Sequence, residues 1–124
     1  MGLDISQLTS QGASLLEQFV QKNGLEGAVI ATAEGLEMAS YFKSDKDADI
    51  IAADMASLLA STSSVLDNTT SGTLSEMIIN ASNGAIAIKD LGEDIALGVL
   101  APAGFKMGGL IVALKQFVKE LQAV

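Results

Sequence analysis

The sequence predicts an α+β fold, in which one antiparallel sheet of five strands carries helices on both faces. Three observations support this prediction. Stretches with helical and strand periodicity alternate in the order helix, two strands, helix, three strands, helix. Short turn-forming sequences separate neighbouring strands, which favours antiparallel pairing. The last two strands are apolar on both sides, so both faces of the sheet must be covered.

Length and composition indicate one domain that has a partner. Residues 1–124 contain no linker, repeat or low-complexity segment that would divide them. Hydrophobic residues make up 49% of the chain and charged residues only 18%, which is few for the surface of a monomer. We therefore expect an oligomer or a bound protein.

The charge of the chain limits the class of partner. Its net charge is −8 and lysine is its only basic residue type, which argues against nucleic acid and anionic lipid. No uninterrupted apolar run reaches the ~18 residues of a membrane span, and the N-terminus does not look like a signal peptide. The absence of cysteine fits a reducing compartment. We expect no integral membrane association and a cytoplasmic location.

The first helix is predicted over residues 4–22. Asp4 is a suitable N-cap, and apolar residues then recur at helical spacing. Asn23 and Gly24 end the helix, because both residues tolerate the left-handed backbone found at helix C-termini.

A hairpin is predicted next, with strands at residues 25–32 and 36–43. Glu34 and Gly35 form the tight turn between them. The second strand alternates apolar and polar residues and has one charged side, which indicates an edge position.

The middle helix, residues 47–66, has apolar residues on one face but lacks a charged opposite face. No charged side chain occurs from Met55 to Leu66. The apolar stripe that we expect to face the sheet comprises Ile51, Met55, Leu58, Leu59, Thr62, Val65 and Leu66. A second stripe, of small residues, comprises Ala52, Ala53, Ala56, Ala60, Ser63 and Ser64. Because a monomer of this size offers only one core, we expect the second neighbour of this helix to be another protein chain.

Three strands and a last helix are predicted for the remaining chain, at residues 73–81, 85–89, 95–101 and 105–122. Asn83-Gly84 is the strongest hairpin signal in the sequence, and residues 91–94 form the next turn. Glu76 interrupts an apolar strand. It either guards an exposed sheet edge or lies at the rim of a strand-to-strand contact.

The residue types that most catalytic sites require are missing. Histidine, cysteine, arginine and tryptophan are all absent, which removes the usual nucleophilic triads, zinc sites and arginine clamps on phosphate. The run DKDAD at residues 45–49 resembles the start of a calcium loop but lacks the required glycine and glutamate further on. No phosphate-binding glycine motif occurs. We expect no enzymatic activity, no cofactor and no metal.

Three stretches of the chain match a known pattern. They are the hairpin GAVIATAEGLEMAS (residues 27–40), the small-residue helix that follows it, and the ending LAPAGFKMGGLIVALKQFVKEL (residues 100–121). Together they resemble the roadblock/LC7 family, in its prokaryotic branch. The chain departs from the family in having Glu34-Gly35 where Asp-Gly is usual, and lysines where the last helix often has arginines.

The resemblance implies a strand order of 2-1-5-4-3, with the first and last helices on one face and the middle helix on the other. It also implies homodimers in which the middle helices and the third strands meet. On this basis we expect dimer contacts from Ala52, Met55, Ala56, Leu59, Ala60, Ser63, Ser75, Met77 and Ile79. The family further implies a non-enzymatic partnership with small Ras-like GTPases. We expect that partner to contact Ala53, Ser57, Ser61 and Ser64.

Two functions from different classes therefore compete. The first is a homodimeric regulator or adaptor of a small Ras-like GTPase, acting as an activating, localising or scaffolding subunit. The second is a small-molecule sensor of PAS or GAF type, which also places helices around an antiparallel sheet. A sensor needs a cavity with convergent polar groups, whereas the central strands here carry only Ala, Gly, Ile, Leu and Val. A well-packed core would favour the first function.

Overall fold

The computed structural model describes residues 4–123, and its elements follow the predicted order. The elements are α1 (Ile5–Asn23), β1 (Gly27–Thr32), β2 (Glu37–Phe42), α2 (Ala48–Asn68), β3 (Glu76–Ala81), β4 (Gly84–Gly92), β5 (Ile95–Pro102) and α3 (Met107–Ala123).

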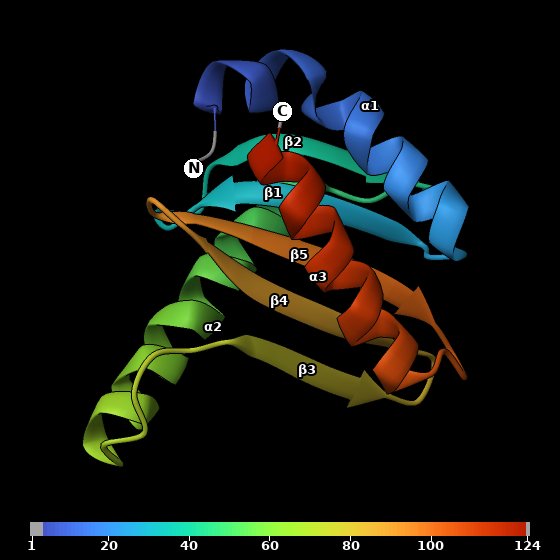
Figure 1. The fold of residues 1–124 in the computed structure, drawn as a ribbon. Helices are drawn as coiled ribbons and strands as arrows, with labels where there is room; N and C mark the ends of the chain where they lie inside the picture. The colour runs from blue at the N-terminus through green and yellow to red at the C-terminus, as the bar shows by residue number, and fades with distance from the viewer. Residues whose placement is uncertain (1–3, 124) are drawn as a thin grey trace.

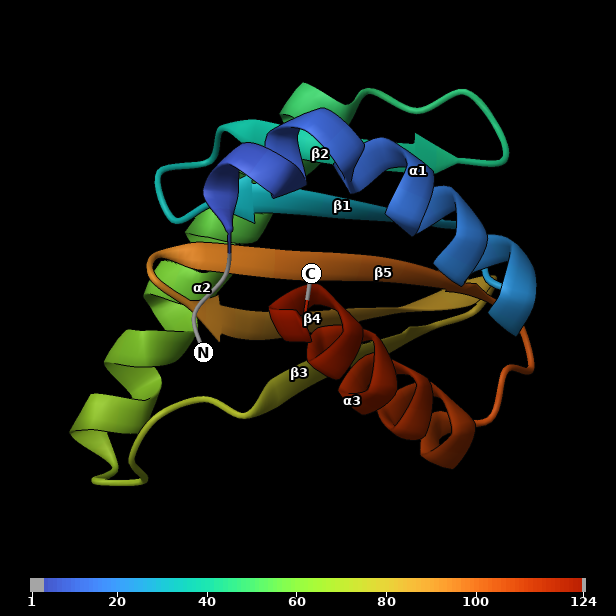
Figure 2. The ribbon, with the colours of Figure 1, turned by 45° about the horizontal axis from the view of Figure 1, so that its top comes forward.

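The five strands form one sheet in the order β2-β1-β5-β4-β3, and every neighbouring pair is antiparallel. Helices α1 and α3 cover one face of the sheet, and α2 crosses the other (Figure 1). A view turned by 45° shows the same three layers, with the C-terminal end of α2 extending past the end of the strands (Figure 2). The predicted fold class and strand order are confirmed.

The larger core lies between the sheet and the α1–α3 layer. Leu16 and Leu110 come from the two helices and meet Leu97 of the central strand β5, and all three are almost completely buried. Phe19 and Phe117 stack with their ring centroids 4.2 Å apart, which joins α1 to α3. Among residues 4–123, no polar or charged side chain is buried. This face of the sheet is therefore held by apolar packing.

Helix α1 has the predicted caps and an unusually close contact with the sheet. The Asp4 side chain accepts a hydrogen bond from the Gln7 N–H, and Gly24 ends the helix in left-handed backbone. In the middle of the helix, Gly12 lies against Ala39 of β2. A Cβ added to Gly12 would lie 2.6 Å from the Ala39 Cβ. The absence of a side chain at residue 12 is what lets α1 lie this close to β2.

The turns of the β3–β4–β5 meander differ in detail from the prediction. Ser82 and Asn83 form the first turn, and Gly84 already belongs to β4. A Cβ at Gly84 would lie 2.7 Å from the Ala101 carbonyl oxygen, so close strand packing, and not a left-handed turn, requires this glycine. The left-handed turn is the next one, at Glu93 and Asp94, whose φ angles are 56° and 60°.

Strand β3 begins three residues later than the predicted start at residue 73. Its first paired residue is Glu76, opposite Lys89, and the pairing of β4 with β5 shifts register between Asp90 and Gly92. Beyond Lys89, β4 therefore pairs only with β5. Residues 73–75 have no strand beside them and run as a connection from α2 into the sheet edge.

The connection after α2 contains one strained residue. Thr70 has a φ of 52°, a left-handed conformation that a β-branched residue adopts at a cost. We expect Thr70→Asn to raise the free energy of unfolding by about 1 kcal/mol, because asparagine tolerates this conformation better. Urea denaturation followed by circular dichroism measures the change. The same replacement at Thr69, whose hydroxyl donates to the Val65 carbonyl at 2.8 Å, should lower stability instead. A loss of stability in Thr70→Asn would contradict the expectation.

Candidate functional site

Helix α2 is the least covered of the three helices. Of its 21 residues, only Ala52 and Met55 are buried. Met55 packs with Val29 and Ile88 on the sheet face. It lies directly over Gly98 of β5, where an added Cβ would come within 2.6 Å of the Met55 sulfur. Ala52 and Met55 were expected at a dimer interface, but their side chains are buried in the core of their own chain, and we therefore leave them out of that surface.

The side of α2 that points away from the sheet carries mainly small side chains, although Ile50 and Asp54 are also exposed near its N-terminal end. It includes the four residues expected to contact a partner, all of which are exposed: Ala53, Ser57, Ser61 and Ser64. We call these four residues the outer face. The Ser57 hydroxyl donates to the Ala53 carbonyl at 3.3 Å, which ties one polar group back to the helix. The four residues of the outer face are small and uncharged, so a partner could lie close to the helix backbone.

One flank of α2 is mainly apolar, with Asp54 as its charged residue, and continues onto the uncovered part of the sheet. Leu58 is 39% exposed and Val65 is 60% exposed, although both belong to the stripe expected to be buried. Ile86 of β4, 38% exposed, lies across a groove of about 140 Å³ from Leu58, and Ile51 and Leu100 also line this groove. We call these five residues the apolar flank. Exposed large aliphatic side chains gathered between a helix and a sheet are typical of a protein interface.

The opposite flank of α2 is lined by small residues and opens into a larger cleft of about 420 Å³. Ala56, Leu59, Ala60 and Ser63, four of the expected dimer-contact residues, line this cleft. The β1–β2 turn borders the same flank at Gly35, where an added Cβ would lie 3.1 Å from the Ala53 Cα.

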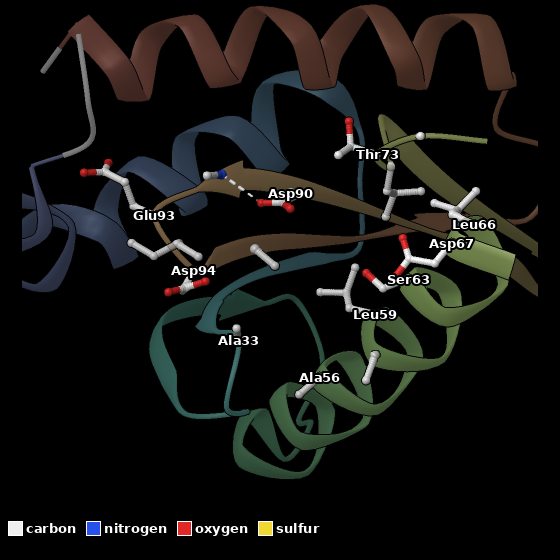
Figure 3. A pocket seen from close by; sticks show the side chains of 16 residues that line it. Ala33, Ala56, Leu59, Ser63, Leu66, Asp67, Thr73, Asp90, Glu93 and Asp94 are labelled. Atoms are coloured by element: carbon white, nitrogen blue, oxygen red, sulfur yellow. Dashed lines mark hydrogen bonds between the residues drawn. The ribbon is translucent and has the colours of Figure 1, made fainter. Parts of the chain in front are cut away.

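The walls of the cleft come from different elements of the chain, and each wall carries negatively charged side chains (Figure 3). Asp67 comes from the C-terminal end of α2, and Asp90, Glu93 and Asp94 come from β4 and the β4–β5 turn. Asp90 accepts a hydrogen bond from the Gly92 N–H at 2.8 Å, which fixes the carboxylate at the rim. No lysine lines the cleft. We call this feature the acidic cleft.

Strand β3 supplies the remaining expected dimer-contact residues. It forms one edge of the sheet and is hydrogen-bonded to β4 alone. Met77 and Ile79 are half-buried, and Ser75 is exposed just before the strand. The Met77 sulfur accepts a hydrogen bond from the Thr62 hydroxyl at 3.4 Å, which links α2 to this edge. An edge strand with apolar residues and no proline or lysine is open to pairing with another strand.

Helix α2 also has the length and composition of a membrane span, the one such helix among residues 4–123. Only 11% of its apolar window is buried. From the sequence we expect no membrane span, because no uninterrupted apolar run is long enough. Serine and threonine interrupt the apolar run in this helix, but they lower its mean hydropathy only a little. The helix also carries Asp49, Asp54 and Asp67. We interpret its exposed apolar side chains as a surface for protein contacts, because they continue onto the sheet face.

Comparisons with known proteins agree with this geometry. The sequence model of the Roadblock/LC7 domain matches residues 12–101. The uncharacterized protein MJ1340 of Methanocaldococcus jannaschii is 24% identical over 110 residues, which are 89% of this chain and 96% of that protein.

Two solved structures have a similar fold. MglB of Myxococcus xanthus has a TM-score of 0.84 and 11% identity, over 91% of this chain and 86% of that one. A Roadblock/LC7 domain from Streptomyces avermitilis has a TM-score of 0.78 and 20% identity, over 87% of this chain and 92% of that one.

Proposed function

Because the chain belongs to the Roadblock/LC7 domain family, we propose that it is a non-enzymatic regulator or adaptor that works with a small Ras-like GTPase. The observation that carries the proposal is the exposure of α2, with two buried residues out of 21. A helix this uncovered, with an uncharged outer face of small side chains, is suited to close contact with another protein. A cytoplasmic location is part of the proposal.

The proposed assembly is a homodimer through α2 and β3. Two β3 edges that pair would continue the sheet across both chains and satisfy the free N–H and C=O groups of each edge. The apolar flank lies on the side of α2 that faces β4, so a second α2 could cover Leu58 and Ile86. In a twofold dimer each chain contributes the same surface, so the apolar flanks of both chains would be buried.

The composition restricts how such a dimer could accelerate GTP hydrolysis. Arginine fingers stabilise the transferring phosphoryl group and raise rates by about 10³ to 10⁵. This chain has no arginine, and none of its seven lysines lies in α2. A lysine also lacks the planar fork of arginine. We therefore propose that any activation is indirect, with the outer face holding the catalytic segments of the GTPase in place.

Tryptophan substitutions on the outer face test the proposal. Ser57→Trp and Ser61→Trp should block binding and any activation sterically, while the dimer survives. The measurement is a pull-down with nucleotide-locked small GTPases from the native cytoplasm, followed by single-turnover GTP hydrolysis. Ser10→Trp, on the exposed side of α1, is the matched control and should bind normally. Binding that is unchanged in both α2 variants would exclude the outer face.

Lysine substitutions test the indirect mechanism separately. Replacing each lysine by methionine, one at a time, should leave activation within about tenfold, or ~1.4 kcal/mol of barrier. One lysine whose loss removes activation by about 10³ with binding intact would show a direct electrostatic role. The seven positions are Lys22, Lys43, Lys46, Lys89, Lys106, Lys115 and Lys119.

The alternative sensor function finds less support. The buried side chains of β4 and β5 are Ala, Ile, Leu and Val, and no polar side chain is buried among residues 4–123. A small-molecule site in the core would need convergent polar groups to orient its ligand.

A further inference from the structure

The acidic cleft has the shape and lining of a binding groove for a protein segment. Its volume of about 420 Å³ is in the range of ligand-binding sites and exceeds what one side chain fills. Leu59 and Leu66 of α2 line it from one side, and Ile95 and Ala96 of β5 from the other. The groove therefore offers an apolar floor between two elements that are far apart in the sequence.

The rim determines the charge of what can enter. Asp67 stands on one wall and Asp90 and Asp94 on the other, so carboxylates flank the apolar floor on two sides (Figure 3). The net charge of the chain is −8, and no lysine is among the residues that line the cleft. An acidic or neutral segment would displace water from the carboxylates without giving them a new partner. A basic segment would pair with them instead.

From the apolar floor and the charge complementarity, we propose that the acidic cleft binds a basic amphipathic peptide segment of a protein partner. Aliphatic side chains of the segment would contact Leu59 and Leu66, and its lysines or arginines would lie beside the rim carboxylates. This inference goes beyond the proposed GTPase function and does not depend on it.

The cleft and the apolar flank lie on opposite sides of α2. The cleft opens on the small-residue flank of α2, through Ala56 and Ala60, whereas the apolar flank opens on the other side through Leu58. A dimer that covers the apolar flank thus leaves the acidic cleft accessible on each chain, and one segment could bind per chain.

The test uses the full chain and three fluorescein-labelled synthetic peptides of 12 residues. The first has leucines at helical spacing and lysines at the other positions. The second replaces each leucine by serine and so keeps only the charge, and the third replaces each lysine by glutamate. Fluorescence anisotropy should show saturable binding of the leucine–lysine peptide alone, with one peptide per chain. Equal binding of the leucine–serine peptide would show general charge attraction and overturn the proposal, as would no binding of the leucine–lysine peptide.

Charge-neutralising variants locate the binding. The triple variant Asp67→Asn, Asp90→Asn, Asp94→Asn should weaken it by about tenfold, since each exposed charge pair contributes modestly. The matched control Glu17→Gln, Glu26→Gln, Glu120→Gln removes the same number of charges from exposed residues elsewhere and should change affinity less than about twofold. Equal weakening in both triple variants would overturn the proposal.

Blocking and mapping complete the test. Ala60→Trp should fill the cleft and abolish binding while circular dichroism stays unchanged. In the unmodified chain, the amide resonances of Gly72 and Gly92, which line the cleft, should shift on addition of the peptide, and those of Gly24 and Gly104 should not. Shifts confined to residues outside the cleft would overturn the proposal even if the peptide binds.

Discussion

Replacing Gly12 by valine should lower the free energy of unfolding by about 3 kcal/mol, the upper end of the usual effect of overpacking. A Cβ at this position would lie 2.6 Å from the Cβ of Ala39, and neither atom can rotate away. Valine adds two further methyl groups at the same point. Helix α1 would have to move off β2, which would also disturb the packing of Leu8 and Leu16 one turn to either side. Urea denaturation followed by circular dichroism gives the change directly.

Two further variants separate this contact from the general effect of valine in a helix. Gly108→Val places the same side chain in α3 where no atom lies within 4 Å, and stability should stay equal or rise slightly, since valine has the better helix propensity. Ala39→Gly introduced into Gly12→Ala should recover part of the stability lost by Gly12→Ala alone. If Gly12→Val proves as stable as the unmodified chain, α1 does not lie as close to β2 as described.

Replacing Leu58 by aspartate should raise the dissociation constant of the proposed dimer by about 100-fold, or ~2.8 kcal/mol. Leu58 is 39% exposed in the single chain and faces Ile86 across the apolar groove, so a dimer that covers this groove would bury two new carboxylates without partners. Sedimentation velocity over a range of concentrations measures the shift. Since the side chain is already partly exposed, the monomer should keep its fold.

The controls identify which flank of α2 forms the interface. Val112→Asp makes a similar change on the exposed side of α3 and should leave the dimer intact. Ala60→Asp lies on the cleft side of α2 and should also be tolerated. Dissociation by Ala60→Asp but not by Leu58→Asp would move the interface to the small-residue flank. The sequence alone favours that flank.

The fold could be predicted because its signals are local. The capping residue Asp4, the stop at Gly24 and the residue pattern of each strand depend only on near neighbours in the chain. Turn geometry was less predictable. Asn83-Gly84 does mark a hairpin, yet the carbonyl of Ala101, on another strand, is what requires glycine there. A contact between strands leaves no trace in the dipeptide itself.

The site was only partly predictable, for a related reason. The apolar stripe of α2 is wide, and periodicity cannot tell which part of a wide stripe meets the sheet. The position of Gly98 decides this, because the space above it receives Met55 and so sets the rotation of the helix. Leu58 and Val65 thereby become exposed, and Ala52 becomes buried. The exposure of the outer face was easier to predict, since its small uncharged side chains are visible in the sequence, and its contact with a partner stays a prediction.

The sparse attachment of α2 has a thermodynamic consequence for its two flanks. With so few buried contacts, this helix should open locally at a lower free energy than β5, and its amide hydrogens should exchange with solvent sooner. A molecule that immobilises α2 from one side has already removed conformational entropy that a second binder would otherwise have to remove. Dimerisation along the apolar flank and peptide binding in the acidic cleft would then strengthen each other, and by the same factor in either order.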